Sequence, residues 1–275
     1  MAVDHTSPAA TAAPARPSDA EMEARRAAAR GRTDAVRSAF RHELGIAFGP
    51  HPRQVLDIYY PAQTGSATPT LVFLHGGGFR QGEPSSNAYH GQPYLQHGGI
   101  FVSMGYRLAP DGVRFPDSAE DVELGLGWLR EHLADRDGDP ARIYLSGHSA
   151  GAMLAAQVGL RSASAARLRG LVLISGFYDV SSHSDEIINR ASPRYVANLA
   201  EGIQHVPEHT ILVAGDQDFP AALPNAEALA AALQAKGGSV EVFTEPNADH
   251  FAANRSFVQA GAPVFEATRR MLQLP

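Results

Sequence analysis

The chain has 275 residues, of which 44% are apolar, and this is enough for one large α/β domain or two smaller ones. It contains no cysteine, which excludes disulfides and thiolate metal sites. The formal net charge of −6 at pH 7, without a basic stripe interleaved with aromatic residues, argues against a nucleic-acid partner. There is neither the apolar core of a signal peptide nor an apolar run of about 18 residues, so we expect a cytoplasmic protein without a membrane span.

The N-terminal region divides into a tail and a helix. Residues 1–18 are rich in Ala, Pro, Ser and Thr and are predicted to be disordered. Ser18 or Asp19 is a suitable cap for a helix that runs to about His42, within a helical segment that we place at residues 19–45. The many arginines of this helix allow two interpretations, an anchor to an anionic surface or a solvated helix that flanks the functional site. The thin apolar face of the helix favours the second.

Residues 46–275 alternate between predicted strands and helices and form the main domain. The strand at 55–60 alternates like a half-exposed one, and the runs at 71–74 and 100–104 are continuously apolar, as in buried parallel strands. Apolar residues at helical spacing predict the helices, and Pro263 is expected in the first turn of the last one. This order predicts a mostly parallel sheet with helices on both faces, which binds ligands at the carboxyl ends of its strands. The predicted strands are 55–60, 71–74, 100–104, 143–145, 171–174, 211–214 and 240–243, and the predicted helices are 117–134, 152–160, 226–233 and one within 256–272.

A nucleophile signature follows one of these strands. Residues 147–151 read Gly-His-Ser-Ala-Gly and lie between the apolar run 143–145 and the helix-like run that starts at residue 152. The glycines permit a sharp turn from strand to helix, which exposes the Ser149 hydroxyl above the sheet edge at a helix N-terminus. The pattern therefore predicts Ser149 as a nucleophile.

A serine nucleophile needs a base within hydrogen-bond reach and an acid that orients the base. Asp218 lies just past the strand at 211–214, and His250 lies after the last predicted strand. The order Ser149, Asp218, His250 is the one expected for a nucleophile on this kind of turn. Asp216 is a rival for the acid, and we favour Asp218 because its longer turn can reach across to a histidine.

A glycine-rich segment follows the strand at 71–74. Residues 75–79 read His-Gly-Gly-Gly-Phe, and the backbone N–H groups of such a turn can approach an oxyanion closely. Gly77, Gly78 and Ala150 are the expected oxyanion donors. A phosphate-binding loop is the alternative, but the segment has neither a following G-K-[ST] nor G-x-G-x-x-G spacing. His75 is expected to form structural hydrogen bonds beneath this loop.

The lining of the substrate pocket is the least specific prediction. The segment from about 180 to 208 lies between two strands without a strong strand pattern, and we expect it to form a small cap over the site. Its apolar residues can serve to line the pocket or simply to pack. The predicted lining residues are Phe79, Tyr178, Tyr195 and Phe251, with Ile187 and Ile188 as further candidates within the cap.

Taken in order, the motifs resemble those of the α/β-hydrolase superfamily. They are residues 75–79, the run Gly-Tyr-Arg-Leu-Ala-Pro at 105–110 with 115–116 and 120–121, and residues 147–151. The chain is most similar to the hormone-sensitive-lipase-like esterases and the related carboxylesterase and arylformamidase branch, over roughly residues 50–272. The resemblance implies an eight-stranded, mostly parallel sheet and hydrolysis of acyl esters or amides without a metal or another cofactor. It also supports the assignments of the triad and the oxyanion donors.

Several residues depart from the lipase-like pattern. His148 and Ala152 stand where that branch usually has Asp and a second Gly, and this is closer to arylformamidases. Residues 249–251 also resemble the motif around the catalytic histidine of kynurenine formamidases. Residues 106–110, in contrast, are more typical of esterases.

We therefore expect a serine hydrolase that cleaves small carboxylic esters through an acyl-enzyme on Ser149. The alternative is an arylformamidase acting on amides of the N-formylkynurenine type. A non-catalytic ligand receptor on the same fold is a third interpretation, and the intact set of three residues argues against it. The expected partner is a small-molecule ester or amide, and the sequence leaves open whether the protein is a monomer or a homodimer.

Overall fold

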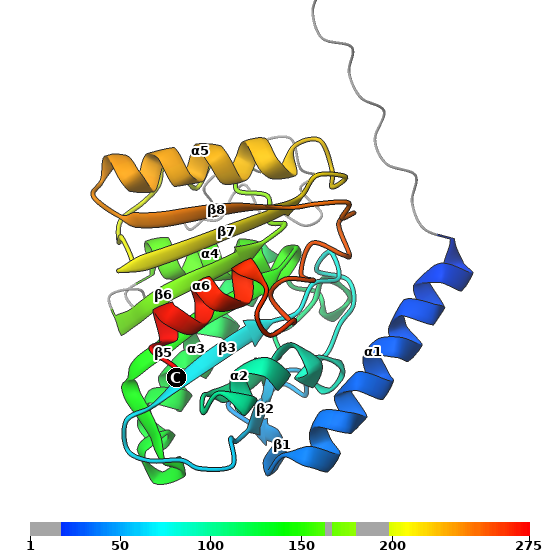
Figure 1. Cartoon of the computed structure of the whole chain (residues 1–275), viewed down its shortest axis with the longest axis vertical. Coiled ribbons are helices and arrows are strands. Elements are labelled where there is room, and N and C mark those ends of the chain that lie inside the picture. The colour runs from blue at the N-terminus through cyan, green and yellow to red at the C-terminus, as the bar shows by residue number, and fades with distance from the viewer. Residues whose placement is uncertain (1–17, 163–166, 180–197) are drawn as a thin grey trace, which may run out of the picture.

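An eight-stranded sheet runs through the computed structural model, which describes residues 18–162, 167–179 and 198–275 (Figure 1). The strand order is β1-β2-β4-β3-β5-β6-β7-β8. β2 is antiparallel to both of its neighbours, β1 and β4, and the pairs β4–β3, β3–β5, β5–β6, β6–β7 and β7–β8 are parallel. The strands are β1 (His42–Ala47), β2 (Val55–Tyr59), β3 (Thr68–Leu74), β4 (Ile100–Met104), β5 (Gly138–His148), β6 (Leu168–Ile174), β7 (His209–Gly215) and β8 (Ser239–Glu245).

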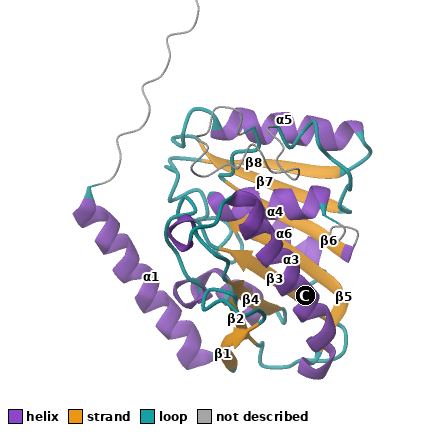
Figure 2. Ribbon diagram, turned by 180° about the vertical axis from the view of Figure 1, so that it is seen from behind, coloured by secondary structure: helices purple, strands orange, loops and turns teal. Residues whose placement is uncertain are grey.

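Helices cover both faces of the sheet (Figure 2). One hydrophobic cluster joins α3, α4 and α5 to the sheet, and a second joins α2 and α6 to the other face. This confirms the predicted fold class, a mostly parallel sheet between two helical layers. Among the described residues, none of the helices has the length and apolar character that crossing a membrane requires. The helices are α1 (Asp19–Ala39), α2 (Gln92–Gln96), α3 (Phe115–His132), α4 (Ala150–Arg161), α5 (Ala222–Ala235) and α6 (Pro263–Leu272).

Local sequence explains where several helices begin. Ser18 caps α1 through a capping box with Glu21, which satisfies two amide groups of the first turn. Asp117 accepts a hydrogen bond from the amide of Arg114 at 2.8 Å and so fixes the start of α3. Pro263 occupies the first turn of α6, as predicted.

The predicted N-terminal helix is too long. Helix α1 ends at Ala39, three residues before His42, and residues 42–45 belong to the edge strand β1. Strand β1 is half-exposed, contains Gly45 at φ 64° and pairs with β2 through an irregular register. A strand of this kind buries too little surface to give an apolar run, so the sequence pattern did not predict it.

Two predicted segments fall largely outside the described residues. The tail at 1–18 is described only at Ser18, and most of the predicted cap, including Ile187, Ile188 and Tyr195, lies within 180–197. The rest of the cap segment packs against the domain, where Leu199 is buried in the same cluster as α3 and α4.

The carboxyl ends of the parallel strands lie along one edge of the sheet, as register and direction require. Ligands bind at this edge in open α/β sheets. Each predicted site residue follows one of these ends: residues 75–79 follow β3, Ser149 follows β5, Asp218 follows β7 and His250 follows β8.

Candidate active site

Ser149 occupies a strained turn between β5 and α4. Its backbone has φ 55° and ψ −120°, which a side-chain-bearing residue rarely adopts. The flanking glycines make room for this turn. A Cβ on Gly147 would lie 2.4 Å from the backbone of Gly151, and a Cβ on Gly151 would lie 2.1 Å from the carbonyl oxygen of Leu74. The turn is therefore so tight in itself, and packs so closely against β3, that neither glycine can carry a side chain.

The structure brings Ser149, His250 and Asp218 together through two hydrogen bonds. His250 Nε2 lies 2.8 Å from Ser149 Oγ, and His250 Nδ1 lies 2.8 Å from Asp218 Oδ1. Both His250 and Asp218 are buried. These residues are 32 and 101 positions apart along the chain, so the fold alone creates this arrangement.

Asp218 is held as a carboxylate by its surroundings. Burial raises the pKa of this carboxyl, but the hydrogen bond and charge of His250 and hydrogen bonds from Ser175 and the amide of Phe219 outweigh burial and lower the pKa below its usual value. Ser175 Oγ donates to Asp218 Oδ2 at 2.5 Å, and the Phe219 amide donates to Oδ1 at 2.7 Å. The acid is therefore ionised and fixed in one orientation, which is what a group that orients a histidine needs. Sequence reasoning missed Ser175, because a serine after a strand carries no recognisable pattern.

Asp216, the rival acid, has a different set of partners. Its carboxylate accepts hydrogen bonds from the amides of Asn247 at 2.9 Å and Ala248 at 3.1 Å. It therefore anchors the start of the loop that carries His250.

His148, which precedes the serine, contacts the loop that follows β8 and carries His250, called the histidine loop below. Its Nε2 lies 2.7 Å from the carbonyl oxygen of His250, and the centres of the two rings are 5.0 Å apart. Burial lowers the pKa of His148 to about 4, so at neutral pH the ring is uncharged and donates this hydrogen bond from Nε2. An uncharged neighbour does not repel a positive charge on His250.

The loop formed by residues 75–82, called the glycine loop below, is held in place by its first residue, His75, and by Tyr106. His75 Nδ1 bonds the carbonyl oxygen of Gly76 at 2.8 Å, and the Tyr106 hydroxyl donates to the carbonyl oxygen of His75 at 2.6 Å. The two rings stack with centres 4.4 Å apart, and burial lowers the pKa of His75 to about 4. His75 is thus a neutral structural residue, as expected.

Three backbone amides of this region are available to a ligand. Gly77 has φ 121° and Gly78 has φ 61°, and within the described parts of the chain neither N–H donates a hydrogen bond. Ala150 is the first residue of α4, where an amide has no acceptor within its own helix. These are the donors that sequence analysis predicted for an oxyanion.

Two of the predicted pocket residues are buried. Phe79 is buried and meets the ring of Phe115 edge-on at 5.4 Å, and Tyr178 is buried in the same hydrophobic cluster. Phe79 has φ 59° and follows Gly77 and Gly78, which also have positive φ angles. Tyr195 lies outside the described residues.

Aromatic rings do surround His250. Phe251 is 37% exposed, with its ring centre 5.6 Å from that of His250. Phe219 lies at 4.7 Å and Phe177 at 6.4 Å by the same measure. The sequence pointed to Phe251 alone, because the other two rings reach His250 only through the fold.

Helix α1 lies beside the histidine loop, which agrees with the second interpretation of its arginines. Arg25 donates to both carboxylate oxygens of Asp249, at 2.7 and 3.3 Å, and its guanidinium lies 5.1 Å from the ring centre of Phe251. The helix is therefore joined to the two residues that flank His250.

Comparisons with known proteins identify a family and several relatives. The family model described as BD-FAE matches residues 56–215, more than half of the chain. The chain is 26% identical to a kynurenine formamidase of Danio rerio over 238 residues, which cover 80% of this chain and 78% of the relative. It is 25% identical to an isoprenylcysteine alpha-carbonyl methylesterase of Arabidopsis thaliana, over 72% of this chain but only 53% of the relative. The chain thus spans about half the length of that methylesterase.

Solved structures share the fold. The crystal structure of esterase B from Lactobacillus rhamnosis superposes with a TM-score of 0.70 at 20% identity, and the match covers 92% of each chain. At this identity the likeness concerns the fold alone. The sheet order, the turn at Ser149 and the family match together place the chain in the BD-FAE family of the α/β-hydrolase superfamily.

Proposed function

We propose that this protein is a serine hydrolase that cleaves small carboxylic esters through an acyl-enzyme on Ser149. The observation that carries the proposal is the pair of 2.8 Å hydrogen bonds from Ser149 through His250 to a buried Asp218. A serine hydroxyl is a weak nucleophile unless a base accepts its proton, and the base is effective only in one tautomer. The proton on His250 Nδ1 points to Asp218, which leaves Nε2 free to accept the proton of Ser149.

The reaction then runs in two halves. Ser149 Oγ attacks the ester carbonyl while His250 Nε2 takes its proton, and His250 returns that proton to the leaving alcohol as the tetrahedral intermediate collapses. Water next attacks the acyl-enzyme with His250 again as base, which releases the acid and restores Ser149. The negative charge that forms on the carbonyl oxygen is met by the amides of Gly77, Gly78 and Ala150, and each such donor is typically worth about 3 kcal/mol in the transition state.

A formamidase is the second candidate, and two observations favour it. The chain covers 78% of the kynurenine formamidase relative but only 53% of the methylesterase relative. The rings of Phe219 and Phe251 beside His250 also suit an aromatic leaving group, which His250 must reach in order to protonate it.

The deciding experiment measures kcat/KM for p-nitrophenyl butyrate and N-formylkynurenine side by side, with Ser149→Ala as the blank. We expect the ester to be preferred and both activities to vanish in the blank. A large preference for the formamide would replace the first candidate with the second. Turnover of neither substrate, or full activity in the Ser149→Ala variant, would contradict the proposed function.

A further inference from the structure

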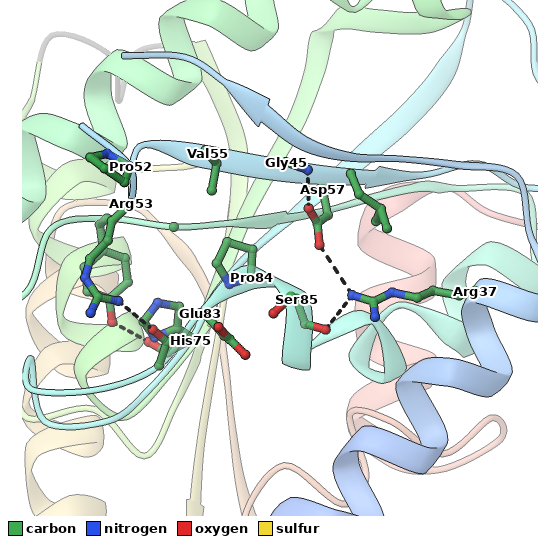
Figure 3. A pocket seen from close by; sticks show the side chains of 14 residues that line it. Arg37, Gly45, Pro52, Arg53, Val55, Asp57, His75, Glu83, Pro84 and Ser85 are labelled. Carbon is green, nitrogen blue, oxygen red and sulfur yellow. Dashed lines mark hydrogen bonds and ion pairs between the residues drawn. The ribbon is translucent and has the colours of Figure 1, made fainter. Parts of the chain in front are cut away.

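The two halves of α1 are attached to the domain in different ways. The C-terminal half carries Val36, which is fully buried, and Arg37, which donates to the carbonyl oxygen of Ser85 at 2.7 Å. Arg37 also pairs with the buried Asp57 (Figure 3). In the N-terminal half, the side chains of residues 20–32 are exposed or half-buried. This half of the helix therefore depends mainly on polar contacts for its position against the domain.

Arg25 forms an ion pair between this N-terminal half of α1 and the histidine loop. Its two terminal nitrogens donate to the two carboxylate oxygens of Asp249, at 2.7 and 3.3 Å, although the two residues are 224 positions apart along the chain. An arginine bound in this forked way fixes the direction of the carboxylate as well as its distance. The guanidinium also lies 5.1 Å from the ring centre of Phe251. Arg25 therefore contacts the residues on both sides of His250.

Asp249 connects this contact to the backbone of the histidine loop. Its Oδ1 accepts hydrogen bonds from the amides of Phe251 at 3.0 Å and Ala252 at 2.8 Å, and so closes a turn that includes His250. From the other side the same turn is held by His148, whose Nε2 donates to the carbonyl oxygen of His250 at 2.7 Å. The backbone that carries the imidazole of His250 is therefore held between His148 and the carboxylate of Asp249.

The geometry of the site leaves little room for movement of this backbone. His250 Nε2 lies 2.8 Å from Ser149 Oγ, and a proton passes between the two atoms only within hydrogen-bond reach. Asp218 orients the ring through Nδ1, but it does not hold the turn that follows His250. A misplacement of about 1 Å in a catalytic group can reduce a rate by a factor of about 100. A contact that fixes this turn therefore affects the rate without touching the substrate.

We propose that Arg25 is a positioning residue of the active site, which holds the histidine loop through Asp249 and so keeps His250 within reach of the serine. The proposal rests on the proposed function, because His250 must act as the base if its position is to affect a rate. The ion pair is half-exposed, with 42% of the Arg25 side chain and 32% of the Asp249 side chain accessible to solvent. Such pairs contribute little to the free energy of unfolding, so loss of Arg25 should reduce turnover and leave the melting temperature nearly unchanged.

Substitutions of Arg25 test the proposal in the hydrolysis of p-nitrophenyl butyrate. Arg25→Gln should lower kcat about tenfold and change KM less than twofold, because the substitution acts on the base and not on substrate binding. Arg25→Lys keeps the charge but not the fork, and should recover part of the loss. Arg30→Gln is the matched control, because Arg30 lies on the same helix, is 55% exposed and pairs with Glu23 of that helix. Full kcat in Arg25→Gln, or an equal loss in the control, would overturn the proposal.

A double-mutant cycle tests whether the effect runs through Asp249. Asp249→Asn keeps an oxygen that accepts from the amides of Phe251 and Ala252, but it removes the charge that binds Arg25. When Arg25 acts through Asp249, the variant with both substitutions should lose no more activity than the more affected single variant. Losses that multiply in the double variant would show that Arg25 acts elsewhere, and would overturn the proposal.

Amide hydrogen exchange separates this proposal from the proposed function, because it requires no substrate. In Arg25→Gln the amides of residues 251–253 should exchange faster than in the native protein, and in Arg30→Gln they should exchange at the native rate. Faster exchange in Arg25→Gln supports the role of Arg25 in holding the loop even if the native protein hydrolyses no ester, which would contradict the proposed function alone. Unchanged exchange in Arg25→Gln, or faster exchange with full kcat, would overturn the proposal even if esters are hydrolysed.

Discussion

Two walls of the candidate site are built in different ways. The histidine wall, formed by Asp218, His250 and Ser175, is a series of side-chain hydrogen bonds. Asp218 bonds His250 through one carboxylate oxygen and Ser175 through the other. The glycine loop, residues 75–82, presents backbone amides whose direction depends on positive φ angles and on support from Tyr106. Side-chain identity therefore determines the first wall, and backbone conformation determines the second.

This difference separates the expected effects of substitution. In the histidine wall, a change of one atom in one side chain should remove most activity while the fold persists. In the glycine loop, a substitution acts only when the added Cβ forces the backbone to move, so neighbouring glycines should respond differently.

The largest effect is expected for Asp218→Asn. The amide would stabilise the wrong tautomer of His250, and kcat should fall by about 10⁴, as such changes do in serine hydrolases. The matched control is Asp216→Asn, which loses acceptor strength toward the amides of Asn247 and Ala248 and should affect thermal stability more than rate. Steady-state kinetics with melting curves check both, and equal rate losses would show that Asp218 is not the acid.

Gly77→Ala is expected to have the second-largest effect, a decrease of about 10² to 10³ in kcat. A Cβ there would lie 2.0 Å from the carbonyl oxygen of Gln81, and φ 121° is a conformation that alanine resists. Gly78→Ala is the comparison, because its Cβ would meet nothing within 4 Å and its φ of 61° is accessible to other residues at modest cost. Rates measured on one ester should differ by at least tenfold between the variants. A smaller loss for Gly77→Ala than for Gly78→Ala would contradict the account of the loop.

Ser175→Ala should have a smaller effect, a roughly tenfold loss in kcat with little change in KM. In the native protein the hydrogen bond from Ser175 to Asp218 Oδ2 lowers the pKa of that carboxyl. The substitution removes this bond and should raise the pKa. The variant should therefore lose activity at a higher pH on the acidic side than the native protein does. A pH–rate profile tests this, and an unchanged acidic limb would reduce Ser175 to a packing role.

The smallest expected effect is a decrease in the stability of the folded protein as the pH falls. Burial lowers the pKa of His75 and of His148 from 6.5 to about 4. As the pH falls, these two histidines are therefore protonated in the unfolded chain before they are protonated in the folded one. Stability should be complete above about pH 6.5 and decrease as the pH falls toward 4. The lowered pKa of Asp218 acts in the same direction, but only below 3.8.

Melting temperatures between pH 7.5 and pH 4.5 measure this effect. His75→Gln should give a shallower decrease than the native protein, because one buried neutral histidine is gone. The same slope in both proteins would show that His75 is not responsible.

The sequence predicted the parts of the site that lie in order along the chain. Ser149, Asp218 and His250 could be chosen because strand ends and residue order restrict the options. The roles of Ser175 and His148 could not, since each depends on a contact across the sheet edge, Ser175 with Asp218 and His148 with the carbonyl of His250. Contacts between residues so far apart in the chain cannot be predicted from the spacing of residues in the sequence.

Exposure explains the error in the fold at residues 40–45. The buried strands could be predicted from their apolar runs, whereas β1 is half-exposed and was predicted as the end of a helix. Phe79 was expected at the pocket because of its place after the glycines, and in the structure its ring is buried against that of Phe115.

The central claim is that Ser149 carries the acyl group. Its most direct test is intact-protein mass spectrometry after rapid quenching of the reaction with p-nitrophenyl butyrate, followed by peptide mapping of the adduct. The account predicts a single butyryl group on the peptide that contains Ser149, and none in the Ser149→Ala variant. An adduct on another residue, or one that persists in that variant, would contradict it.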